Sequence, residues 1–173
     1  MLLTDILRPR GVKVPLEGDG KREIIAELVA LLAQNGDLEE QQEALGAVLH
    51  REDTRTTAIG NGLAIPHAKT SAATETVMAI GVARAPVDFD SVDGLGVTVV
   101  VLLVSPPEKS AAHIQVLARI SRILGADALL EKIAACRSAE DVFETIRRYE
   151  RTVASVRDRE HPTRDAEELS KSL

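Results

Sequence analysis

Residues 97–104 read VTVVVLLV, the most apolar stretch of the chain, and Pro106 and Pro107 follow it after a single serine. Apolar and polar side chains do not alternate here, as they would in a strand with one face in water. Such a run is typical of a strand in the middle of a sheet with both faces covered. Its length is far below the roughly 20 residues of a membrane-spanning helix. The stretch therefore predicts a globular protein built around this strand.

Helical and extended segments alternate on both sides of that strand. Apolar residues recur at helical spacing, which predicts helices at 21–34, 38–51, 108–124, 126–135 and 139–149, with a short entry helix at 2–7. Shorter extended pieces are predicted at 12–14, 63–66 and 77–83. Ala85-Pro86 is expected to form a turn, and Asp19 and Ser138 are expected to cap the helices that follow them. The pattern predicts an α/β fold with four or five strands.

Composition limits the classes of function. The chain has 173 residues, 45% of them hydrophobic, and a net charge of -6. An acidic chain without a basic stripe predicts no nucleic-acid partner, and 2% aromatic residues leave almost no stacking surface for bases or sugars. The N-terminus lacks a secretory signal, so we expect a cytoplasmic protein without membrane insertion. Composition becomes more charged after residue 150, which predicts a domain at 1–150 and a partly helical or flexible tail at 151–173.

Two histidines are candidates for chemistry. His67 follows GNGLAIP, so it is expected at the end of a short strand where Pro66 stops the pairing and exposes the next side chain. A neutral imidazole there is a nucleophile or a proton carrier; the alternative is a ring that only hydrogen-bonds its own turn. His113 lies near the start of a helix, where it either binds an anion or fills the core.

Charged and turn residues surround these candidates in the sequence. Arg51, Arg55 and Lys69 flank the His67 segment, either as surface charges or as partners for a phosphoryl group. Gly60, Asn61 and Gly62 form a turn that favours positive φ. His50 and His161 are expected on the surface, and the histidine spacing gives no metal pair, so no metal site is predicted.

The segment from Thr57 to Lys69, TAIGNGLAIPHAK, closely resembles the signature of the phosphotransferase-system enzyme IIA family of the fructose, mannitol and nitrogen type. The resemblance extends over residues 1–150. It implies a mixed sheet of about five strands flanked by helices on both faces. It also implies that His67 accepts a phosphoryl group, that His113 supports it, and that Arg51 stabilises its charge. Ala58 and Ala68 stand where glycine is common in the family.

The resemblance also implies partners and a mechanism. An HPr-type phosphocarrier, or its nitrogen-branch counterpart, would phosphorylate His67, and no cofactor would be needed. The phosphoryl group would then pass to an enzyme IIB in sugar transport, or it would switch the binding of a regulatory partner such as a sensor kinase or a potassium transporter. The regulatory branch is the preferred interpretation. A binding module that keeps the fold without being phosphorylated is the other alternative.

Overall fold

A six-stranded mixed sheet forms the centre of the computed structural model, which describes residues 1–160. The strands are β1 (Leu7–Leu16), β2 (Ala58–Gly60), β3 (Leu63–Ala64), β4 (His67–Lys69), β5 (Val77–Val87) and β6 (Val97–Ser105). Their order is β1-β5-β6-β3-β2, and β4 also pairs with β6. β1 is parallel to β5, β3 and β4 are parallel to β6, and β5 is antiparallel to β6.

The predicted central strand is confirmed, because β6 lies in the middle of this order. Its side chains divide between two hydrophobic cores, one on each face of the sheet. Val100 and Leu102 belong to one core, and Val99, Val101 and Leu103 belong to the other. These residues are fully buried on both faces, which explains why the strand shows no alternation of apolar and polar residues.

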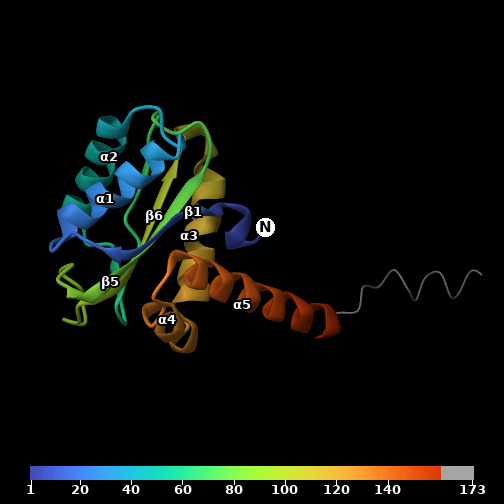
Figure 1. Cartoon of the computed structure of the whole chain (residues 1–173). Helices are drawn as coiled ribbons and strands as arrows, with labels where there is room; N and C mark the ends of the chain where they lie inside the picture. The colour runs from blue at the N-terminus through green and yellow to red at the C-terminus, as the bar shows by residue number, and fades with distance from the viewer. Residues whose placement is uncertain (161–173) are drawn as a thin grey trace, which may run out of the picture.

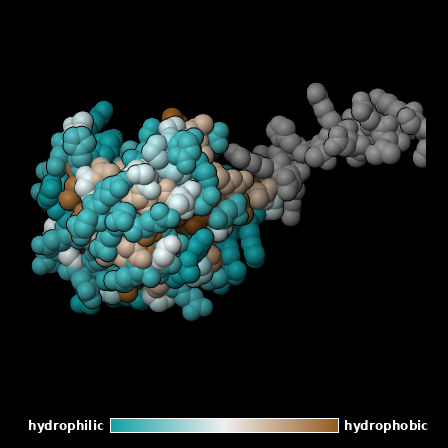
Figure 2. Space-filling model, turned by 90° about the horizontal axis from the view of Figure 1, so that it is seen from above, coloured by the Kyte–Doolittle hydropathy of each residue, from teal (hydrophilic) through white to brown (hydrophobic). Residues whose placement is uncertain are grey.

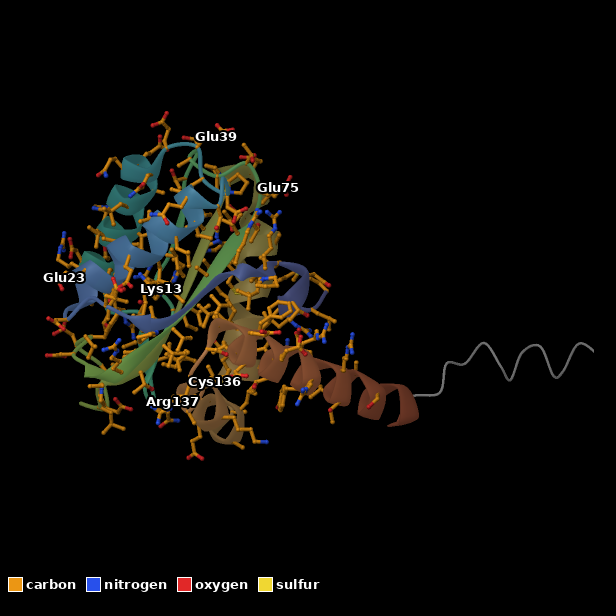
Figure 3. All side chains as sticks on the ribbon, in the orientation of Figure 1. Lys13, Glu23, Glu39, Glu75, Cys136 and Arg137 are labelled. Carbon is orange, nitrogen blue, oxygen red and sulfur yellow. The ribbon has the colours of Figure 1, made fainter. Side chains whose placement is uncertain are left out.

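Helices cover both faces, as Figure 1 shows. α1 (Lys21–Gln34) and α2 (Gln41–Thr54) pack on one face. The other face carries α3 (Ser110–Leu124), α4 (Asp127–Ala134) and α5 (Ala139–Glu160). The expected α/β class, with a mixed sheet between helical layers, is therefore correct. The surface in Figure 2 is mostly hydrophilic, and the labelled side chains of Glu23 and Glu39 in Figure 3 lie at the periphery.

The first strand is longer than the sequence predicts. A single 3-10 turn, Leu3–Asp5, replaces the expected entry helix, and β1 then continues through Pro9 and Pro15. An edge strand tolerates proline because one side of it needs no N–H donors. The pairing with β5 is also irregular between Leu7 and Val12. In the same way β5 continues through the predicted turn at Ala85-Pro86 and pairs again at Val87.

Two expectations about the helix ends are wrong and one is confirmed. α2 begins at Gln41 rather than 38, because Leu38 is buried in the core between the two helices. α1 has Gly20 at its N-cap position instead of Asp19, whose own N–H donates to Glu23. Ser138 does cap α5, since its Oγ accepts the N–H of Asp141 at 3.1 Å.

The last helix extends beyond the predicted boundary at residue 150. α5 runs to Glu160 and projects from the body of the molecule in Figure 1. The rest of the predicted tail, including His161, lies outside the described residues. Within residues 1–160, no helix combines the length and the apolar character that crossing a membrane demands.

Candidate functional site

Pro66 separates two short strands that pair with the same neighbour. β3 pairs with β6 at Ala64↔Val100, and β4 resumes the pairing at His67↔Leu103. Between them the Pro66 carbonyl still accepts the N–H of Leu103 at 3.0 Å. The expected break is therefore confirmed only in part: β3 ends at Ala64, but the pairing with β6 resumes at His67. Pro66 lacks only a donor, so its acceptor keeps the chain on β6 and fixes the backbone position of His67.

The His67 ring is held through one nitrogen. Its Nδ1 lies 2.7 Å from the carbonyl oxygen of Ile65. A carbonyl oxygen only accepts, so Nδ1 carries the proton and Nε2 carries the lone pair. Burial lowers the pKa of His67, and the charge of Arg51 lowers it further, against opposing effects of Ile65 and Glu52. The ring is consequently neutral at pH 7, with a nucleophilic Nε2.

His113 lies beside His67, with ring centroids 5.6 Å apart and an interplanar angle of 52°. It is the fourth residue of α3 and is buried. Its Nδ1 lies 2.8 Å from Oγ of Ser105, at the end of β6. Burial lowers the pKa of His113 to about 4, and the neighbouring His67 and Lys69 contribute to the shift. The structure thus places His113 both in the core and next to the candidate nucleophile.

Two cations lie near the histidine pair. Arg51 is in the last turn of α2, where its Nη1 donates to the carbonyl of Arg55 at 2.9 Å. Lys69 on β4 donates to Oγ of Ser110 at 3.0 Å, at the start of α3. Their charges affect the pKa values of His67 and His113 respectively. Of the three basic residues that flank the segment, Arg55 contributes only its backbone to these contacts.

The glycine turn is not next to the histidines. Gly60, Asn61 and Gly62 all have positive φ, and the carbonyl of Gly62 accepts N–H groups at the start of β6. His67 pairs with Leu103, near the opposite end of β6. Five residues of strand correspond to about 16 Å. The turn therefore shapes the β2–β3 hairpin. It does not position the two histidines, which lie on β4 and α3.

Two buried residues at this site were not identified from the sequence. Ser105 is fully buried and contacts His113. Glu52 is also buried, and it accepts the N–H and the hydroxyl of Thr57 while its Oε1 lies 3.5 Å from Nζ of Lys21. Ser105 carried a weak signal as the polar residue that closes the apolar strand. The sequence carried no signal for Glu52, because its burial depends on contacts with α1 and with Thr57 that form only in the folded protein.

The family's two missing glycines have no consequence for the backbone. Ala58 and Ala68 are buried in β2 and β4. Among the described residues, the only ones other than glycine with positive φ are Asn61 and Asp90. Alanine therefore fits both positions without strain.

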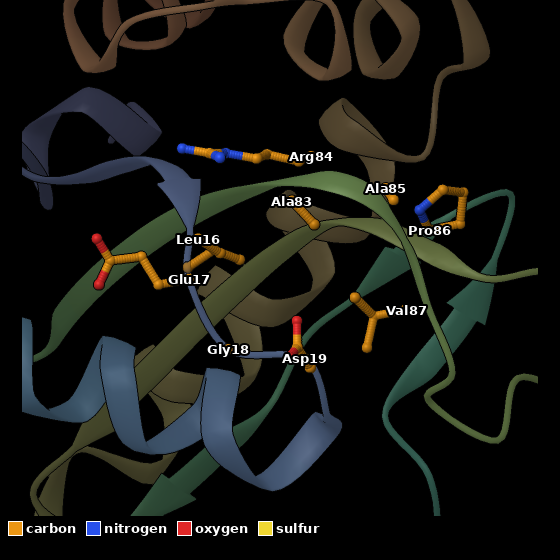
Figure 4. A pocket seen from close by; sticks show the side chains of 9 residues that line it. All are labelled: Leu16, Glu17, Gly18, Asp19, Ala83, Arg84, Ala85, Pro86 and Val87. Carbon is orange, nitrogen blue, oxygen red and sulfur yellow. The ribbon is translucent and has the colours of Figure 1, made fainter.

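A hollow of about 500 Å³ lies elsewhere on the sheet. Residues 16–19 and 83–87 line it, where β1 ends and β5 bends (Figure 4). It shares no residue with the histidine pair. Among the side chains that the structure describes, His, Cys, Asp and Glu form no group of three or more that suits a metal ion.

Comparison with protein families gives a match over residues 5–149 to the model described as "Phosphoenolpyruvate-dependent sugar phosphotransferase system, EIIA 2". A nitrogen regulatory protein of Bradyrhizobium diazoefficiens is 32% identical over 84% of this chain and 95% of its own length. The fructose-specific EIIABC component of Bacillus subtilis is 28% identical over 87% of this chain. The match spans about a quarter of that larger protein, 24% of its length.

Solved structures show the same fold. The crystal structure of nitrogen regulatory protein IIA-Ntr from Neisseria meningitidis matches with a TM-score of 0.76 at 25% identity, over 83% of this chain and 98% of its own. The Escherichia coli complex of enzyme IIAMTL with phosphorylated enzyme IIBMTL matches with a TM-score of 0.69 at 22% identity, over 81% of this chain and 96% of that one.

Proposed function

This chain belongs to the EIIA 2 family of the phosphoenolpyruvate-dependent sugar phosphotransferase system, and on that basis we propose that His67 is its phosphoryl acceptor. The observation that carries the proposal is the 2.7 Å contact between Nδ1 of His67 and the Ile65 carbonyl. It leaves the lone pair on Nε2, in a ring that burial keeps neutral. Nε2 attacks phosphorus, the bond to the donor breaks, and the bonding electrons return to the donor.

The surroundings of His67 suit an incoming phosphoryl group. Arg51 and Lys69 supply positive charge beside the two imidazoles, where negative charge develops on the phosphoryl oxygens. Ile114, which follows His113 on α3, is 65% exposed. An exposed apolar side chain next to His113 in the sequence favours docking of a protein donor, such as an HPr-type phosphocarrier, on this end of α3. His113 and Arg51 hold the transferred group in this proposal.

The regulatory branch is the use of the phosphoryl group that we favour. Sequence identity to the nitrogen regulatory protein and to the fructose component is similar, 32% and 28%. The solved structure with a TM-score of 0.76 and 25% identity is also that of a nitrogen regulatory protein, IIA-Ntr. Phosphorylation would add about two negative charges at His67 and so change which partner binds. Transfer to an enzyme IIB in sugar transport is the second candidate, supported by the IIAMTL complex.

Intact mass spectrometry tests the proposal. Wild type and His67→Ala are incubated with phosphoenolpyruvate, enzyme I and HPr, and separately with the nitrogen-branch donors. We expect one acid-labile phosphoryl group on wild type and none on His67→Ala, while His50→Gln, an exposed histidine on α2, behaves as wild type. Full phosphorylation of His67→Ala would exclude His67 as the acceptor. Failure of wild type with every donor would leave a binding module, and onward transfer to an enzyme IIB would favour the transport branch.

A further inference from the structure

Ser105 connects the central strand to the histidine pair. It is the last residue of β6 and has no exposed surface. Its carbonyl accepts the N–H of Thr70 at 2.9 Å, which holds the backbone in place after β4. Its Oγ lies 2.8 Å from Nδ1 of His113. A rigid strand end thus presents a hydroxyl to the ring that faces His67.

The direction of this hydrogen bond follows from the donors and acceptors available. His113 is neutral at pH 7, because burial lowers its pKa to about 4, so one ring nitrogen donates and the other accepts. Among the groups that the structure describes, Nδ1 of His113 is the only hydrogen-bond partner of the Ser105 Oγ. If Nδ1 donated, the buried hydroxyl proton would have no acceptor there, which is costly. Donation from Ser105 to Nδ1 satisfies both groups.

We propose that Ser105 is a positioning residue that donates to Nδ1 of His113 and thereby keeps the His113 proton on Nε2. The proposal rests on the proposed function of His67. With its proton on Nε2, His113 donates a hydrogen bond to an oxygen of the phosphoryl group on His67. The opposite tautomer would direct a lone pair at that oxygen and repel it. Ser105 itself touches neither the phosphoryl group nor its donor.

Long-range proton–nitrogen NMR correlation of the imidazoles at pH 7 tests the tautomer directly. We expect His113 of the wild type to be protonated at Nε2, with Nδ1 as a hydrogen-bond acceptor. In Ser105→Ala the form protonated at Nδ1 should appear, and Ser105→Thr, which restores the hydroxyl, should return the wild-type spectrum. A wild-type His113 protonated at Nδ1 would overturn the proposal without any variant. The measurement needs no phosphoryl donor, so it stands apart from the function of His67.

The rate of phosphoryl transfer from HPr provides the second readout. Ser105→Ala should slow transfer roughly tenfold, the scale of one net hydrogen bond, and Ser105→Thr should recover most of the loss. Ser121→Ala is the matched control, because Ser121 is exposed on the same helix as His113. A Ser105→Ala protein with the wild-type rate and tautomer would refute the role of Ser105 and leave His67 as the acceptor. If wild type accepted no phosphoryl group, the proposed function would fail instead.

Discussion

At the scale of single residues, the two imidazoles share one arrangement. Nδ1 of His67 contacts the Ile65 carbonyl, and Nδ1 of His113 contacts the Ser105 hydroxyl. In both rings Nε2 makes none of these contacts. In His67 it carries a lone pair, and in His113 it is the proposed hydrogen-bond donor. Burial lowers both pKa values. The protein thus keeps the proposed nucleophile neutral beside a neutral ring, because a protonated His67 would have no lone pair to offer.

The low pKa of His113 predicts a pH dependence of stability. Its pKa is lowered from 6.5 to about 4 in the folded protein, so between these values only the unfolded chain binds the proton. Stability from this group is present above pH 6.5 and is lost as pH falls toward 4. From pH 7 to pH 5 the loss is about 2 kcal/mol. Urea unfolding at both pH values should show a fall in stability that is larger in wild type than in His113→Gln by about this amount, because the lowered pKa of His67 acts in both proteins.

A matched histidine separates this effect from general acid sensitivity. His50 is exposed on α2, so His50→Gln should keep the wild-type fall in stability. An equal fall in wild type and His113→Gln would mean that His113 titrates alike in the folded and unfolded states.

At the scale of elements, the two halves of the motif GNGLAIPH lie at opposite ends of β6. GNG closes the β2–β3 hairpin at the start of β6, and Pro66-His67 lies near the end of β6. Positive φ at three consecutive residues makes the turn tight, and the interruption at Pro66 separates β3 from β4. The motif therefore sets the register of two short strands on β6, and this register delivers His67 opposite Leu103.

Glycine replacements test this division of roles. Gly62 has φ of 84°, and a Cβ there would lie 3.2 Å from Oγ1 of Thr98, so Gly62→Ala should lower the free energy of unfolding by about 1–2 kcal/mol. Gly46 is exposed inside α2, and a Cβ added there would meet only open space. Gly46→Ala should raise stability by about 0.5–1 kcal/mol. Urea denaturation measures both, and equal effects of the same sign would contradict the backbone argument.

At the scale of the whole molecule, a buried carboxylate joins the N-terminal turn to α3 and α5. Glu150 on α5 has 1% exposure and accepts the N–H groups of Leu3 and Thr4, at 2.7 and 3.1 Å. It also accepts from the Thr4 hydroxyl at 2.9 Å and pairs with Arg119 of α3 at 3.1 Å. One side chain therefore holds the first turn, α3 and α5 together. α3 also carries His113, so this contact helps to fix the helix behind the site.

Removal of the Glu150 charge should lower the free energy of unfolding substantially. Glu150→Gln leaves Arg119 partly buried without its partner and places an amide donor against backbone donors, so we expect a loss of roughly 3 kcal/mol. Glu144→Gln on the same helix breaks a more exposed pair with Arg147 and should cost less than about 0.5 kcal/mol. Thermal or urea unfolding distinguishes them. A Glu150→Gln protein as stable as Glu144→Gln would show that the N-terminal contacts contribute little.

The sequence by itself determined the features that neighbouring residues encode. The unbroken apolar run of β6 predicted a strand covered on both faces, helical spacing predicted α1 at residues 21–34, and the motif ending in Pro66-His67 pointed to the family. Only the tertiary structure decided how far β1 extends, which nitrogen of His67 is free, and that Ser105 contacts His113. The length of β1 depends on its pairing with β5, and the free nitrogen of His67 depends on the position of the Ile65 carbonyl. The contact of Ser105 with His113 depends on the packing of α3 against β6. Local periodicity carries no information about such contacts, because the partners are fixed by packing between separate elements.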